Sequence, residues 1–297
     1  EPMELLPETT LGNFFNQQER ETATYQLIQT VSGTSHRGLG LHLYKAGFDL
    51  LYTEFEGKSV SRPVQIRRSD GSLVRQLDFG ASGPLKIRSN DFALYAQDRI
   101  QPNTRWYLEL GGRLDRDAVI NRINFTPRAG AAVLLNQSGT AVIRSGYGLF
   151  FERTPSVAGL FEEYESYTDT RFGPDGVTPL GPPVAFRHTT MPNLKTSRSR
   201  TWDAAYDHRF NAHWALHLGV IDRRGANELI VEPVTGAAGA ALVLNSNGRS
   251  RYREAEIGVH FTAGTRADVN ASYARSEAKA DLNAFTAFFD SMLSPVV

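Results

Sequence analysis

In several long stretches of the sequence, the charged side chains share one parity of an alternating pattern. Between Trp106 and Asp115, for example, Glu109, Arg113 and Asp115 share one parity, and apolar residues occupy the other. Side chains of a strand point alternately to its two faces, so this pattern predicts one charged and one apolar face. Charged groups on one surface can bind a polar ligand, although each could equally serve to hydrate that surface. The candidate ligand contacts predicted in this way are Lys45, Asp49, Glu109, Arg113, Asp115, Arg144, Glu152, Asp207, Arg209, Glu254 and Glu256.

The sequence predicts no catalytic residue, no metal site and no cofactor. It contains no Cys, which excludes disulfides and thiolate ligands. Neither a G-x-S-x-G nucleophile elbow nor a Walker-type phosphate loop occurs. His213 and His217 share one parity, but two His residues alone do not make a metal site. The acidic run 162–165 could hold calcium, but such runs are usually only solvated. Because the sequence has no nucleophile elbow and no metal-site pattern, a hydrolase is the least supported function class.

Composition narrows the class of protein. The 297 residues are 41% hydrophobic and 22% charged, and 32 Lys and Arg balance 32 Asp and Glu, so we expect no nucleic-acid partner. Mean hydropathy is -0.33, and no stretch approaches the roughly 20 apolar residues of a membrane helix. Transmembrane β-barrels escape that criterion, because only every second residue faces lipid. The start has no signal-peptide pattern, and we expect both ends to be cuts within a longer chain.

Ten segments alternate in this way, and they are long. Strands of ordinary domains have about 5–6 residues, whereas segments of about 12–18 residues suit tilted strands that cross a membrane. The predicted strands are 20–32, 38–56, 87–100, 104–118, 126–137, 140–153, 197–210, 213–232, 249–262 and 266–280.

Short and long connections alternate along the chain. Short ones are expected at 33–37, 101–103, 138–139, 211–212 and 263–265, and long ones at 57–86, 119–125, 154–196, 233–248 and from 281 onward. An outer-membrane barrel has short periplasmic turns and long extracellular loops. A soluble sandwich also has apolar-in, polar-out strands, but it has no reason to keep its long loops at one end.

Aromatic residues sit beside the short turns. Trp106, Phe210, Trp214 and Phe261 would form the periplasmic aromatic girdle of a barrel, or core aromatics of a sandwich. Arg275 does not follow the alternation, because it is charged but shares the parity of the apolar Tyr273. It lies toward the long-loop end of its predicted strand.

The long loops contain their own structural signals. Residues 69–72 (Ser-Asp-Gly-Ser) lie between extended runs and predict a hairpin. Residues 173–176 and 181–183 predict turns, and 281–293 predict a short helix capped by Asp281. Because loops on a rigid scaffold carry specificity, we expect ligand discrimination mainly in 57–86 and 154–196.

Four pieces of sequence resemble a known family in their order and spacing. They are Tyr95–Asp98, Leu110–Asp115, Thr126–Gly130 and Arg144–Phe151. Together they resemble the β-barrel of TonB-dependent outer-membrane receptors, and the nearest kind is the Oar-like group, whose full-length members often carry an N-terminal carboxypeptidase-regulatory-like domain.

The resemblance implies an all-β fold, an antiparallel up-and-down transmembrane β-barrel in the outer membrane of a Gram-negative bacterium. The family implies 22 strands and an N-terminal plug. This sequence shows about ten strands, no plug and no TonB box, so we expect a partial barrel domain over 1–297. Residues 1–19 and 281–297 are expected as outer loops, and 20–280 as barrel strands.

The resemblance also implies import of a scarce ligand such as a siderophore, cobalamin or a glycan, driven through TonB. The expected partners are outer-membrane lipid, TonB and the plug domain of the full-length protein, and a small-molecule or glycan ligand at the outer loops. The charged candidates could then form ion pairs with the plug. The alternative function is a non-transporting surface protein, such as an adhesin or a scaffold for cell contact or secretion. A TonB box and plug upstream would favour import.

Overall fold

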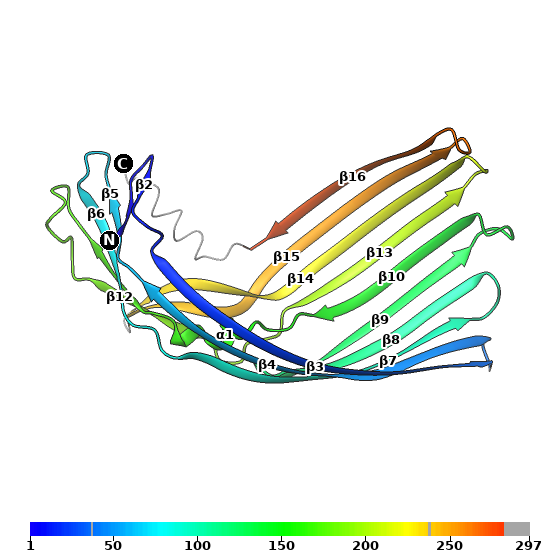
Figure 1. The fold of residues 1–297 in the computed structure, drawn as a ribbon, viewed down its shortest axis with the longest axis horizontal. Helices are drawn as coiled ribbons and strands as arrows, with labels where there is room; N and C mark the ends of the chain where they lie inside the picture. The colour runs from blue at the N-terminus through cyan, green and yellow to red at the C-terminus, as the bar shows by residue number, and fades with distance from the viewer. Residues whose placement is uncertain (37, 237–238, 282–297) are drawn as a thin grey trace.

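The computed structural model describes residues 1–36, 38–236 and 239–281. They form one 16-stranded sheet that curves into a wall (Figure 1). Within the described part of the chain, β3 (Asn16–His36) pairs only with β4, and β16 (Asp268–Ala280) pairs only with β15. The wall is therefore open between these two strands.

Ten long strands make up the wall, and each overlaps one predicted segment. Their order is β3-β4-β7-β8-β9-β10-β13-β14-β15-β16, with antiparallel neighbours throughout. The predicted fold class is thus confirmed. The eight strands between β3 and β16 are β4 (Leu41–Ser61), β7 (Leu85–Gln101), β8 (Trp106–Asp117), β9 (Arg122–Leu134), β10 (Ala141–Phe151), β13 (Arg198–Arg209), β14 (Trp214–Gly236) and β15 (Gly239–Thr262).

The strand register aligns the apolar residues into continuous rows on one side of the wall, here called the apolar face. The row through the middle of the wall joins Trp106, Val133, Ile143, Tyr206, Leu218, Ile257 and Tyr273, each directly opposite the next. These side chains have no protein layer over them, and Tyr273 is 65% exposed. The other side, the polar face, carries the alternating charged residues.

Asparagine side chains hold three of the short turns. The Asn103 Oδ1 atom accepts the backbone N–H groups of Arg105 and Trp106, and the Asn211 Oδ1 atom accepts those of His213 and Trp214. Asn136 does the same for the turn between β9 and β10. An Asn side-chain oxygen that accepts backbone N–H groups a few residues later favours a tight turn, so these three connections stay short.

The structure contradicts two of the predicted long loops, 119–125 and 233–248. The expected loop 119–125 is a turn between Asp117 and Arg122, closed by hydrogen bonds from Val119 N and Ile120 N to Asp117 Oδ1. The expected loop 233–248 is mostly strand, because β14 and β15 stay paired nearly to their tips and bury Leu242 and Leu244. The helix predicted at 281–293 lies outside the described residues apart from Asp281.

The remaining strands form a second region beyond the wall, here called the loop sheet. It contains β1 (Met3–Leu5), β2 (Thr10–Leu11), β5 (Val64–Arg67), β6 (Leu73–Phe79), β11 (Tyr167–Arg171) and β12 (Val184–Thr190). The predicted hairpin around residues 69–72 is confirmed as β5–β6. Parallel pairing of β12 with the outer part of β15 joins this region to the wall.

The loop sheet has its own hydrophobic core. Val64, Leu77 and Leu242 are fully buried there, together with Tyr167 and Phe186, whose rings stack at 4.9 Å. Helix α1 (Ser156–Gly159) and the 3-10 turn η1 (Phe161–Glu163) lie beside it. None of the helices in the described residues has the length and apolar character needed to cross a membrane.

Candidate functional site

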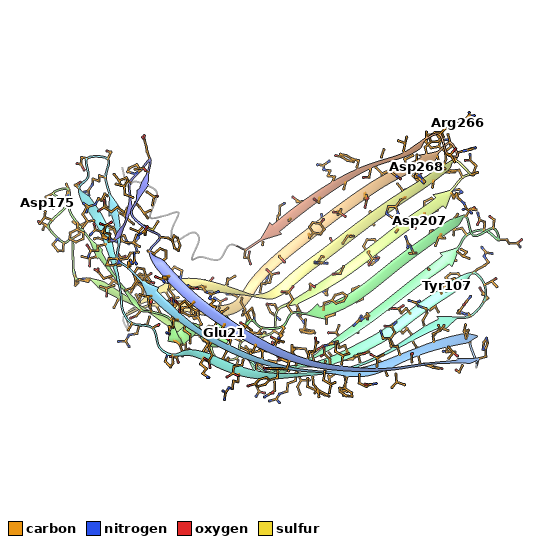
Figure 2. All side chains as sticks on the ribbon, in the orientation of Figure 1. Glu21, Tyr107, Asp175, Asp207, Arg266 and Asp268 are labelled. Carbon is orange, nitrogen blue, oxygen red and sulfur yellow. The ribbon has the colours of Figure 1, made fainter. Side chains whose placement is uncertain are left out.

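The predicted contact residues do not meet at one point. They separate into groups along the polar face, at different distances from the short turns. Figure 2 shows Asp207 and Tyr107 toward the short-turn end and Asp175 at the opposite end, among the loops.

The group nearest the loops lies in a pocket of about 470 Å³, here called the outer pocket. It contains Asp49, Arg113, Asp115 and Glu152, which come from β4, β8 and the residue after β10. Arg113 Nε lies 2.7 Å from Asp115 Oδ1, and Arg113 Nη2 lies 3.2 Å from Asp49 Oδ2. One guanidinium thus holds carboxylates of β4 and β8 in a fixed arrangement.

Arg153 is an important residue of this pocket that the sequence pattern did not predict. Its Nη2 atom lies 2.7 Å from Asp91 Oδ2 and donates hydrogen bonds to Thr53 Oγ1 and Ser89 Oγ. The side chain therefore links the end of β10 to β4 and β7. Strand parity would place Arg153 on the apolar face, but the chain leaves β10 at Phe151, and the alternation no longer applies.

Two further residues of the outer pocket follow the parity of the polar face, and alternation alone could have identified them. Asp91 accepts the backbone N–H of Ala118 at 2.9 Å besides its ion pair with Arg153. Arg128 has no ion pair or hydrogen bond among the described residues. It is therefore the cationic group of this pocket that is free to contact a bound molecule.

Four predicted residues lie nearer the short turns. Arg144 Nη2 is 2.5 Å from Asp207 Oδ2, and the other oxygen of Asp207 is 2.7 Å from His217 Nδ1. Glu109 pairs with Arg99 at 2.8 Å. Arg209 lines a second pocket of about 490 Å³ with Asp207 and His217. These pairs neutralise charge along the polar face.

The last three predicted residues line none of these pockets. Glu254 accepts a hydrogen bond from the hydroxyl of Tyr252. Lys45 and Glu256 lie on the polar face opposite Gln97 and Gly219, and neither has an ion pair in the described part of the chain. A ligand-binding role for all eleven residues stays a prediction.

The two loops expected to carry specificity pair with each other. Strand β6 comes from 57–86 and β11 from 154–196, and they are antiparallel neighbours. A buried ion pair joins them: Arg75 Nε and Nη2 each donate to one oxygen of Asp169 at 2.6 Å. The sequence signals of the separate loops did not predict this pairing.

The environment of the loop residues shifts several pKa values. Burial raises the pKa of the Tyr167 hydroxyl and lowers the pKa of the His188 imidazole, so both groups are neutral near pH 7. The pKa of Asp175 falls to about 2, because its carboxylate accepts hydrogen bonds from the Thr178 hydroxyl and from backbone N–H groups of Thr178 and Val177.

The acidic run of the loops serves the loop backbone. Glu162 Oε1 accepts the backbone N–H of Thr190 at 2.7 Å, and Glu165 Oε1 accepts that of Ser61 at 3.0 Å. Within the residues that the structure describes, no group of three or more His, Cys, Asp or Glu is arranged to hold a metal ion.

Three solved structures share the fold of this chain over most of its length. The outer membrane transporter YddB from Escherichia coli superposes with a TM-score of 0.65 at 14% identity, covering 88% of this chain and 34% of that one. The siderophore receptor PirA from Acinetobacter baumannii superposes with a TM-score of 0.60 at 14% identity, covering 86% of this chain and 37% of that one. FpvAI in its complex with pyocin S2 superposes with a TM-score of 0.58 at 15% identity, covering 90% of this chain and 34% of that one. The chain thus spans about a third of the length of these structures.

The sequence itself carries the family signature. A search among curated proteins found no match. The family model described as "TonB dependent receptor-like, beta-barrel" matches residues 6–291, which is nearly the whole chain. The chain therefore belongs to the TonB-dependent receptor-like β-barrel family, and it is a β-barrel wall of the Gram-negative outer membrane.

Proposed function

We propose that this chain forms part of the wall and outer loops of an importer that takes a scarce ligand across the outer membrane and has no enzymatic activity. The observation that carries the proposal is the outer pocket, which lies on the polar face where the wall meets the loops. Two of the similar structures are named an outer membrane transporter and a siderophore receptor. The plug domain and TonB are its proposed partners in the full-length protein.

The outer pocket suits a polar ligand that offers both donors and acceptors. Its carboxylates are largely engaged by Arg113 and Arg153, whereas the guanidinium of Arg128 has no partner among the described residues. A guanidinium binds anionic oxygens through two parallel hydrogen bonds. We propose a ligand of the siderophore, cobalamin or glycan class, discriminated mainly by residues 57–86 and 154–196.

Deleting residues 154–196 from the full-length protein tests this function. We expect uptake to be abolished while the barrel stays inserted, because the deletion removes β11 and β12 but no strand of the wall. The measurement is uptake of a radiolabelled ferric siderophore, of cobalamin and of an oligosaccharide, with heat-modifiable gel mobility as the check for an inserted barrel.

Removal of the exposed tip 181–183, which belongs to no strand, is the matched control and should leave uptake unchanged. Unchanged uptake after the larger deletion would contradict the placement of ligand discrimination in these loops. Cells with the intact protein that take up none of the three probes would support the alternative, a non-transporting surface protein.

A further inference from the structure

Four basic residues lie directly opposite one another on four neighbouring strands. They are Arg200 on β13, Arg224 on β14, Arg251 on β15 and Lys279 on β16, and we call them the basic row. Like charges directly opposite in an antiparallel pair destabilise it. Three successive contacts of this kind therefore favour the binding of an anion that bridges them.

The surrounding acidic residues are too few to neutralise the basic row. Asp222 accepts from Arg224, Arg251 and Arg253, at 2.9, 3.1 and 3.0 Å, and Glu277 pairs with Lys279 at 2.5 Å. Two carboxylates thus face the cations of Arg200, Arg224, Arg251, Arg253 and Lys279. Arg200 has no ion pair in the described part of the chain, and the Nε atom of Arg251 is shielded from solvent without a hydrogen-bond partner. The row thus has unused donors as well as excess charge.

The basic row lies on the apolar face, at its outer border. Arg224 has the parity of Leu218 and follows Trp214, beside the short turn, by ten residues. Ten residues span about 33 Å along a strand, or about 25 Å across the membrane at a tilt of ~40°, which equals the height of the apolar band of a barrel. Trp202 and Tyr147, opposite each other, lie one row below. Their position marks the headgroup level.

The other side of the wall provides an internal comparison. On β4 and β7, at the same face, Glu54 lies opposite Arg88 and Glu56 opposite Lys86, and Arg88 Nη2 is 2.6 Å from Glu54 Oε1. Basic residues there have acidic partners across the strand. The excess positive charge is therefore a local property of β13–β16.

We propose that the basic row binds the phosphate groups of an anionic lipid in the outer leaflet. Guanidinium groups bind phosphate through paired, charge-assisted hydrogen bonds, and an ammonium adds a further positive charge. The apolar rows below the basic row would hold the acyl chains. Arg275 lies opposite Ala255, one row nearer the membrane centre than Arg253, where an apolar residue is expected. Because long basic side chains can extend toward headgroups, Arg275 can also reach the lipid phosphates from this position.

The test measures lipid A binding to the full-length protein in neutral detergent by native mass spectrometry. The variant carries Arg200→Gln, Arg224→Gln, Arg251→Gln and Lys279→Gln. A basic residue near an anionic membrane surface contributes about 1 kcal/mol, so we expect about fivefold weaker binding per charge and about 600-fold weaker binding for the four together. Lipid A without its phosphates should bind the intact protein as weakly as the variant.

The matched control is Lys86→Gln with Arg88→Gln, which removes paired charges on the same face, nearer the loops, and should change binding less than about twofold. Equal binding of phosphorylated lipid A by the four-residue variant would overturn the proposal, as would equal binding of the two lipids by the intact protein. If the four-residue variant fails to insert, Arg200→Gln alone must still weaken binding about fivefold. Uptake is not part of the readout, so this result is independent of the proposed import function.

Discussion

Asp169→Ala is expected to unfold the loop sheet while the wall stays inserted in the membrane. Asp169 and Arg75 are both buried, and two hydrogen bonds of 2.6 Å join their side chains. Removing one partner of a buried ion pair leaves an uncompensated charge and costs about 3–5 kcal/mol. Because the pair joins β6 to β11, amide hydrogen exchange in both strands should accelerate toward that of an unfolded segment.

Arg171→Ala is the control for this result. Arg171 Nε lies 3.8 Å from the same carboxylate, but its side chain is 70% exposed, so its loss should change stability by less than about 1 kcal/mol. The double variant Arg75→Met with Asp169→Leu should recover much of the protection, because an apolar pair carries no buried charge. Unaltered exchange in Asp169→Ala would show that the ion pair does not hold the loops together.

Ile257→Lys is expected to destabilise the wall far more than Glu256→Lys at the neighbouring position. Ile257 lies on the apolar face between Leu218 and Tyr273, whereas Glu256 lies on the polar face without an ion pair among the described residues. A Lys facing lipid at the bilayer midplane costs about 2–4 kcal/mol, but one facing a water-filled lumen costs little. Urea unfolding of the full-length protein in lipid vesicles measures the difference.

Equal destabilisation by the two lysines, or a larger effect at Glu256, would mean that the apolar face does not contact lipid. The pair of variants is informative because the two positions are neighbours on one strand, at nearly the same depth, and receive the same new residue. Only the direction of the side chain differs between them.

The wall was predictable from sequence because its signals are local. Alternation along each strand, as from Trp106 to Asp115, sets which side chains share a face, and Asn103 and Asn211 hold their turns through residues two or three positions away. Such short-range patterns predict the ten strands and the end of the wall at which the long loops lie. The connection 233–248 was wrongly predicted because its outer strands are buried in the loop sheet and lack the alternation of a membrane wall.

The loop sheet and the outer pocket depend on contacts between distant parts of the chain. Arg75 and Asp169 are separated by 94 residues, and Arg153 and Thr53 by 100. No periodicity within either loop indicates which carboxylate an arginine will meet. The basic row likewise requires the register of four strands, since Arg200 and Lys279 are aligned only through Arg224 and Arg251.

Single-cysteine scanning along β15 tests the central claim most directly, namely that this chain is a barrel wall with one face in lipid and one in water. The chain has no native Cys, so each introduced thiol is a unique label within it. We predict that fluorophores at 255, 257 and 259 are quenched by nitroxide lipids, and that thiols at 254, 256 and 258 react with a membrane-impermeant reagent. Uniform reactivity at all six positions, or the reversed pattern, would contradict the account.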